Sequence, residues 1–380
     1  MIIKLTYQNL FNYLNYLKNK QIGDLISARV DIKNSRNFYW KINLINNNVL
    51  TIKQKKLYHE NYESFAKEHE VYNFLHRCDD LIEIAYLFPN IINFDKLSSI
   101  IIYKYPETYT SLQTFYEDST TFQTFIPHKL GKIIAKLHSK TSKSQKLYNC
   151  INENQLYLTM PCSGYLLNRF DINSISNFSA ETLGFIAFYQ RHETLQLAVK
   201  EIIKNHRRFS LTHNNLKLNK ILISKTRLSK TKEENQTAIK LIDWENCSWG
   251  DPAFDVGTIL AGYLQIWLNS LTINPAINLN ESLQFATIPL EKLQPSLKFF
   301  LQAYLKEYPK ILQDYPDFIK RVIQFAGLAI IYEIIAKIES RHIFQGTDMC
   351  MLQVAKNLLC KPSQSFRSIL GITEGELSNY

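Results

Sequence analysis

The stretch LTHNNLKLNKILISK (residues 211–225), continued by AIKLIDWENCSWGDPAFDVGTIL (residues 238–260), carries the strongest signal in this chain of 380 residues. It reads as a turn, a short apolar strand, a basic loop and a second apolar strand that ends at an aspartate. Polar residues adjoin both strands, so we expect them at one edge of a cleft: His213, Asn215, Lys217, Lys220 and Asp243.

Composition limits the class of protein. The chain is 46% hydrophobic and 13% aromatic, which is enough for one large core or two smaller ones. Its net charge of +10 could attract phosphates or nucleic acid, but no nucleic-acid-binding motif accompanies it. No apolar run reaches the roughly 20 residues that a membrane span needs. From these two observations we expect neither nucleic acid nor a membrane as a partner. The six cysteines form no C-x-x-C pair, which predicts reduced thiols in a cytoplasmic protein.

The first part of the chain predicts a sheet of about five strands. Residues 24–56 alternate as three strands, and the third ends in VLTIKQ, where alternation directs Lys53 away from the apolar face. A helix over residues 62–78 carries Glu68, and two more apolar strands follow it. Lys53 and Glu68 could form an ion pair near phosphate groups, although two separate solvated charges are the commoner interpretation of such a pattern.

The remainder of the chain is predominantly helical, with one long helix predicted over residues 180–204. Tyr105-Pro106 breaks the last strand and marks a linker. The sequence therefore predicts an α+β fold of two lobes. A β-rich N-terminal lobe would occupy residues 1–105, and a helical C-terminal lobe, which contains the segment 211–260, would occupy residues 106–380.

Two signatures carry a family resemblance. The first is I-D-W-E at residues 242–245 followed by G-D-P-A-F-D at residues 250–255, and the second is the L-x-H-x-x-L frame at residues 211–216. With them the chain resembles the aminoglycoside phosphotransferase and choline kinase superfamily over roughly residues 25–340, which implies a bilobal protein kinase-like fold. SRNFYWKI at residues 35–42 is similar to a narrower branch, the phosphotransferase-like proteins that accompany a lyase in thioamide and lanthionine peptide biosynthesis.

The resemblance implies a role for individual residues. Lys53 would contact the α and β phosphates of ATP, Glu68 would hold Lys53 in place, and Asp243 would coordinate Mg²⁺. Asp251 and Asp255 would be structural and would accept backbone hydrogen bonds near the turn and the loop.

The loop itself departs from the family pattern H-G-D-x-x-x-x-N. Asn215 stands at the aspartate position and Lys220 at the asparagine position. An asparagine amide cannot take a proton from an acceptor hydroxyl. Lys220 would repel a metal ion, because two like unit charges at about 4 Å and a dielectric near 20 interact by about 4 kcal/mol, and a divalent ion doubles this.

Three hypotheses follow from this departure. The first is a pseudokinase that binds Mg-nucleotide and a peptide or protein partner such as a pathway lyase. The second is an active ATP-dependent phosphotransferase for a hydroxyl of a peptide Ser/Thr or a small molecule. In it Asn215 and Lys217 would be the catalytic residues, Lys217 and Lys220 would neutralise the γ-phosphate, and Asp243 would hold one Mg²⁺ ion. The third is a scaffold that binds no nucleotide.

Overall fold

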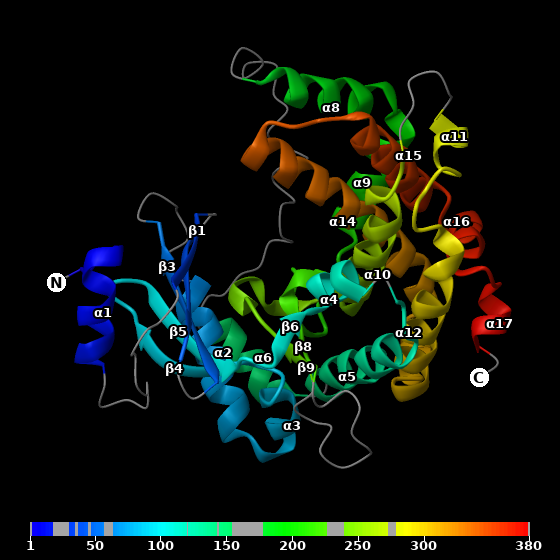
Figure 1. Cartoon of the computed structure of the whole chain (residues 1–380). Helices are drawn as coiled ribbons and strands as arrows, with labels where there is room; N and C mark the ends of the chain where they lie inside the picture. The colour runs from blue at the N-terminus through cyan, green and yellow to red at the C-terminus, as the bar shows by residue number, and fades with distance from the viewer. Residues whose placement is uncertain are drawn as a thin grey trace. The chain divides into compact units, whose positions relative to one another are not determined.

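The computed structural model describes most of the chain, and the structural statements below concern these residues: 2–17, 30–34, 37–44, 47–56, 64–119, 121–142, 144–153, 178–225, 239–272 and 279–378. Contacts group the chain into two compact units (Figure 1). Unit 1 comprises Met1–Asp118, Asn149–Leu156 and Asn219–Cys247, and unit 2 comprises the remaining segments. The division into domains at residues 105 and 106 stays a prediction.

Unit 1 contains the predicted five-stranded sheet. Every neighbouring pair in it is antiparallel, and the strand order is β1-β2-β3-β5-β4. The strands are β1 Val30–Asn34, β2 Asn37–Asn43, β3 Asn48–Lys55, β4 Asn90–Asp95 and β5 Ile100–Pro106. β3 lies at the centre of the sheet, which explains why its residues are almost all buried.

One face of this sheet is covered by the N-terminal helix α1 (Tyr7–Tyr16; Figure 1). The Thr6 side chain caps the helix, because its hydroxyl accepts a hydrogen bond from a first-turn backbone N–H. Leu10 of the helix belongs to the same buried cluster as Leu50 and Ile52 of β3. Alternate residues of β3 therefore face α1.

The other face of the sheet is covered by helix α2 (Ser64–Arg77), whose Phe65 packs with Ile101 of β5. Since side chains alternate along a strand, Lys53 points away from the apolar face that α1 covers. Glu68, one turn into α2, is fully buried. The predicted direction of Lys53 is therefore confirmed.

The segment 219–247 completes unit 1. β6 (Tyr109–Ser111), β8 (Ile221–Ser224) and β9 (Ile239–Leu241) form a second antiparallel sheet. The Leu241 N–H donates to the Leu87 carbonyl at 2.7 Å, and the Phe88 and Trp244 rings stack with centroids 4.0 Å apart. The short helices of the unit are η2 Asp79–Leu81, α3 Ile82–Ala85 and η6 Trp244–Asn246. The sequence division between the units falls within α4 Leu112–Ser119, η4 Leu218–Lys220 and α6 Gln145–Glu153.

Unit 2 is mainly helical. α5 packs along α12, and α14 packs between α10 and α15, while the short strands β7 and β10 pair antiparallel. The elements are α5 Phe125–Thr141, α8 Ala180–Arg191, α9 Glu193–Lys204, β7 Ser210–Thr212, β10 Ser248–Gly250, α10 Pro252–Asn269, α11 Leu279–Ser282, η7 Leu290–Lys292, α12 Gln294–Glu307, α13 Lys310–Asp314, α14 Phe318–Arg341, α15 Gly346–Cys360, α16 Pro362–Leu370 and α17 Glu374–Ser378.

The prediction of one helix over residues 180–204 is wrong. The helix breaks at His192, whose dihedral angles (φ −118°, ψ 82°) are not helical. The His192 ring lies edge-on to Phe188 at 4.7 Å, and its Nδ1 atom lies 3.2 Å from Nζ of Lys356 in α15. No glycine or proline stands next to His192, so the sequence gives no local signal of the break, which coincides with these tertiary contacts.

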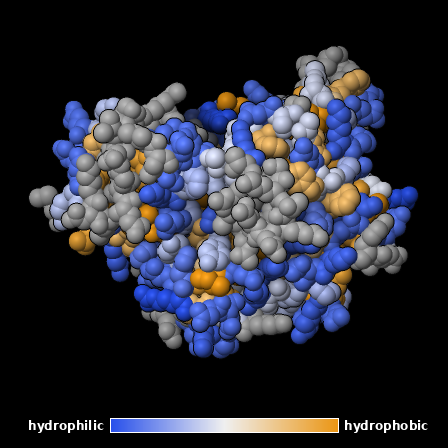
Figure 2. All heavy atoms as spheres, turned by 60° about the horizontal axis from the view of Figure 1, so that its bottom comes forward, coloured by the Kyte–Doolittle hydropathy of each residue, from blue (hydrophilic) through white to orange (hydrophobic). Residues whose placement is uncertain are grey.

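The surface agrees with the composition of the chain. On the face seen in Figure 2, hydrophobic residues form small separate patches among hydrophilic ones. Among the helices in the described ranges, none is long and apolar enough to cross a membrane.

His206 of unit 2 gives a prediction about acid stability. Burial, with the Arg208 and Arg321 charges, lowers its pKa to about 4, although Asp251 opposes the shift. The unfolded chain, with an ordinary histidine pKa near 6.5, therefore binds a proton that the folded chain does not between these values, so stability falls as pH drops through this window. We expect a loss of about 2 kcal/mol between about pH 7.5 and about pH 5.

Urea unfolding at several pH values measures this loss. His206→Gln cannot gain the proton, so its stability should change less over the same window. An equal pH dependence of the wild-type protein and the variant would contradict the assignment.

Candidate functional site

The site in unit 1 is built around Asp243, which follows β9. Its backbone is left-handed (φ 65°, ψ 54°), a conformation that aspartate tolerates better than most residues. On one side, the Ile242 N–H donates to the Lys220 carbonyl at 2.9 Å. On the other, the buried Trp244 fixes the chain, because its indole N–H donates to the Leu241 carbonyl at 2.8 Å. Asp243 is therefore held from both neighbours.

Both carboxylate oxygens of Asp243 contact lysines. Lys53 Nζ pairs with Oδ1, and Lys220 Nζ pairs with Oδ2. The Asp243 and Lys53 side chains are 8% and 6% exposed, whereas that of Lys220 is 26% exposed. The contact with Lys53 is thus shielded from water, which strengthens it, while part of the Lys220 side chain stays accessible.

Glu68 is the least satisfied charged group of the site. In the described part of the chain its carboxylate accepts no hydrogen bond of good geometry, and Lys53 forms its ion pair with Asp243. Burial raises the pKa of Glu68, although Lys53 and Tyr103 lie near enough to oppose the rise. Burial likewise lowers the pKa of Lys53, and Glu68 counteracts it. The two groups therefore interact through space.

Glu245 adds a further carboxylate to this site. It accepts a hydrogen bond from the Asn37 side chain at 3.0 Å. Burial lowers the pKa of Lys55, and Glu245 partly offsets this effect, as it does for Lys53. The sequence reasoning did not single out Glu245, although it stands inside the I-D-W-E signature.

The loop residues of unit 2 are organised by Asp255, which is fully buried. Its carboxylate accepts the backbone N–H groups of His213 at 2.7 Å and Asn214 at 2.8 Å. The Nε2 atom of His138 lies 3.4 Å from the same carboxylate. The expected structural role of Asp255 is confirmed.

Asp251 has the corresponding role at the start of α10. It caps the helix by accepting the Ala253 N–H at 3.0 Å. Arg321 of α14, which is also buried, donates to the same carboxylate through Nε at 3.1 Å. Sequence reasoning missed Arg321, which stands in α14 with no motif around it to mark its role.

Lys217 and Asn215 also belong to unit 2. Lys217 Nζ pairs with Glu333 of α14, and the two side chains are 34% and 41% exposed. The Asn215 carbonyl accepts the Lys217 N–H at 2.9 Å, and Asn215 is partly exposed. The structure thus brings Lys53, Glu68 and Asp243 together within unit 1. The functional roles predicted for Lys53, Glu68, Asp243, Asn215 and Lys217 stay predictions.

A magnesium ion does not fit the arrangement around Asp243. Mg²⁺ requires about six oxygen ligands in near-octahedral geometry. Here both oxygens of Asp243 are engaged by ammonium groups, which repel a cation. Within the described ranges, no group of three or more His, Cys, Asp or Glu side chains could hold a metal ion.

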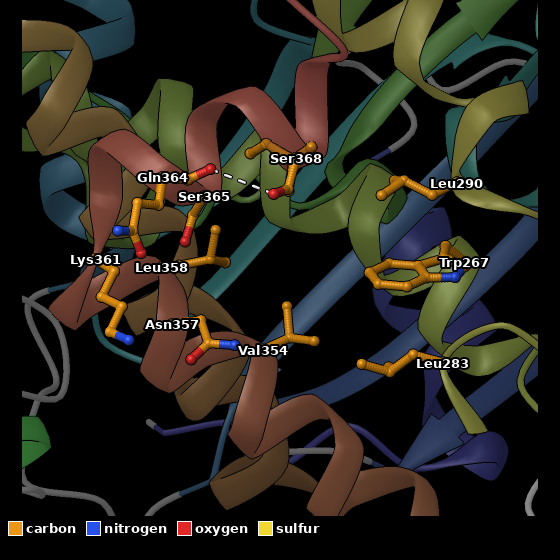
Figure 3. Close-up of a pocket in the computed structure, with 11 residues that line it drawn as sticks. Trp267, Leu283, Leu290, Val354, Asn357, Leu358, Lys361, Gln364, Ser365 and Ser368 are labelled. Atoms are coloured by element: carbon orange, nitrogen blue, oxygen red, sulfur yellow. Dashed lines mark hydrogen bonds between the residues drawn. The ribbon is translucent and has the colours of Figure 1, made fainter. Parts of the chain in front are cut away.

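Unit 2 also contains a hollow of about 320 Å³, shown in Figure 3. Its lining is mostly apolar and includes Trp267, Val354 and Leu358, together with the polar residues Lys361 and Ser368. Trp267 lies near the C-terminal end of α10, whereas Asp255 lies in the first turn of that helix. Since a helix rises about 1.5 Å per residue, the hollow is about 18 Å along the axis from Asp255.

Known proteins match this chain in structure. No family model and no curated protein matches the sequence. A choline/ethanolamine kinase family protein from Mesorhizobium loti has a TM-score of 0.52 at 11% identity, over 95% of this chain and 98% of that one. APH(2")-IIia with GDP and kanamycin has a TM-score of 0.52 at 12% identity, over 92% and 97%. Amicoumacin kinase hAmiN with AMP-PNP, Ca²⁺ and Ami has a TM-score of 0.50 at 10% identity, over 94% and 97%.

These likenesses show the fold. The predicted α+β, bilobal kinase-like fold is confirmed, and the chain has the architecture of kinase-fold phosphotransferases.

Proposed function

We propose that the chain is a pseudokinase, a kinase-fold protein that binds a nucleoside triphosphate but transfers its phosphate weakly or not at all. One observation carries the proposal: both oxygens of Asp243, the candidate metal ligand, are paired with Lys53 and Lys220. Two ammonium groups at one buried carboxylate suit a polyanionic ligand, because each ammonium has three donors and only some are used by Asp243. The same pairing opposes the metal that transfer ordinarily requires.

The chemistry of Asn215 supports the same proposal. General acid–base groups contribute about 10²–10⁴-fold to the rate of a reaction, and an amide cannot supply this term. A protein that keeps the nucleotide-binding residues but lacks the catalytic base would act by binding other molecules, without transferring phosphate. We therefore propose a peptide or protein partner, such as a lyase of a peptide pathway, with the chain in the cytoplasm.

An active phosphotransferase is the second candidate function, with a peptide Ser/Thr or a small-molecule hydroxyl as acceptor. One observation favours it: in the part of the chain that the structure describes, Lys217 Nζ forms an ion pair with Glu333, and both side chains are partly exposed. Such pairs contribute little free energy, so the Lys217 ammonium could leave Glu333 to neutralise a γ-phosphate at small cost. Phosphoryl transfer needs positioning and charge more than a strong base.

Ligand binding is tested by thermal unfolding with ATP, measured both with Mg²⁺ and with a chelator. A ligand at a hundredfold excess over its Kd stabilises the folded state by about 2.7 kcal/mol, so we expect a clear rise in Tm. Lys53→Met should reduce the rise, since it removes one of the two ammonium groups. No rise in Tm under either condition would refute nucleotide binding.

Transfer is tested by mass spectrometry of candidate peptides and small alcohols after incubation with ATP and Mg²⁺. We expect little or no added phosphate from the wild-type protein. The double variant Asn215→Asp, Lys220→Asn should gain activity by about 10²–10⁴-fold, because it restores a base and removes a repelling charge. Robust wild-type transfer that Asn215→Ala abolishes would establish the second candidate function instead.

A further inference from the structure

Lys220 occupies a position that the fold defines closely. Its carbonyl accepts the Ile242 N–H, and the next residue, Ile221, pairs in register with Leu241 of β9. The backbone on either side of the Lys220–Asp243 contact is therefore fixed by the β8–β9 ladder. Strand pairing thus places the backbones of Lys220 and Asp243 near each other, and the Lys220 side chain completes the contact.

The charges of this cluster balance without a metal. Lys53, Lys55 and Lys220 contribute three positive charges, and the carboxylates are those of Asp243, Glu68 and Glu245. A divalent cation at Asp243 would face both ammonium groups at close range. A triphosphate that carries no metal ion would be attracted by the ammonium groups of Lys53 and Lys220, and the Lys220 side chain is partly accessible to it.

We infer that Lys220 acts as a built-in cation in place of a metal, so that unit 1 binds ATP as the metal-free polyanion. The inference rests on the proposed function, because it specifies the form of the ligand at the same site. Lys220 keeps its contact with Asp243 and donates its remaining N–H groups to phosphate oxygens. Mg²⁺ then weakens binding, since it neutralises the charge that the lysines recognise.

Calorimetric titration of the full chain with ATP tests this inference, once with excess EDTA and once with excess Mg²⁺. For the wild-type protein we expect a Kd in EDTA equal to or lower than that in Mg²⁺. Lys220→Asn should weaken binding in EDTA by about ten- to hundredfold, the effect of losing a hydrogen bond to a charged group. In this variant, added Mg²⁺ should restore affinity.

The matched control is Lys225→Asn. Lys225 follows the same strand, β8, at its opposite end and is exposed, so this variant also removes one lysine and should bind ATP as the wild type does. Wild-type binding that requires Mg²⁺ would overturn the inference and leave the proposed function in place. Equal binding by Lys220→Asn and Lys225→Asn in EDTA would overturn the role of Lys220. Absence of ATP binding in both solutions would overturn the proposed function itself.

Discussion

Asp255→Ala is expected to lower the free energy of unfolding by about 3–5 kcal/mol, the cost of breaking a buried charged network from one side. The Asp255 carboxylate accepts two backbone N–H groups, from His213 and Asn214, and both residues are buried. His138 lies against the same carboxylate. Alanine would remove the acceptor of these buried donors and also leave a cavity.

Urea unfolding at neutral pH measures this effect, with two companion variants. Asp255→Asn keeps one acceptor oxygen and a similar volume, so we expect a smaller loss of about 1–3 kcal/mol. Asp314→Ala removes an exposed ion pair with Lys310 on α13, and its loss should stay below about 1 kcal/mol. If Asp255→Ala were no less stable than Asp314→Ala, the account of the loop as organised by Asp255 would be wrong.

Gly257→Ala is expected to destabilise the fold by about 1–3 kcal/mol or more, because α10 and α14 approach closely at this glycine. A Cβ atom there would lie 2.7 Å from the Val322 carbonyl oxygen, 2.8 Å from the Ala326 nitrogen and 2.8 Å from the Phe325 Cβ. Two of these atoms belong to the backbone of α14, so rotation of a side chain cannot relieve the contact. The helices would have to separate.

Gly375→Ala is the matched control for this substitution. A Cβ atom at Gly375, on helix α17, would meet nothing within 4 Å. Alanine there should stabilise the helix by roughly 0.5–1 kcal/mol, since it reduces the entropy of the unfolded chain. The Tm of Gly257→Ala should therefore fall below that of the wild type, and the Tm of Gly375→Ala should rise above it. A shift of both Tm values in the same direction would contradict the proposed close packing.

Much of unit 1 could be predicted from the sequence because its signals are local. Alternation in β3 gives the direction of Lys53, and the I-D-W-E signature locates Asp243 at the end of a strand. Thr6 marks the start of α1 because capping depends on the residues of a single turn. The sequence also shows that Asn215 and Lys220 depart from the family pattern.

The partners of these residues could not be predicted, since they depend on tertiary contacts. The resemblance pairs Lys53 with Glu68, but in the structure Lys53 pairs with Asp243, which lies 190 positions further along the chain. Arg321 and Glu333 stand on α14 with no sequence motif around them, yet they contact Asp251 and Lys217. The break at His192 belongs to the same class, because its contacts come from another helix.

The interleaving of the two units has a consequence for how the protein is made. Unit 1 needs its third segment, Asn219–Cys247, which carries Lys220 and Asp243. Translation at about 5–20 residues per second adds Asp243 roughly 6–25 s after Asp118, because the two are 125 positions apart. During that interval the nascent chain holds Lys53 and Glu68 without the carboxylate that pairs with Lys53, and β6 without β8. The cation–carboxylate site is thus a late product of synthesis, and a fragment that ends at Asp118 cannot contain it.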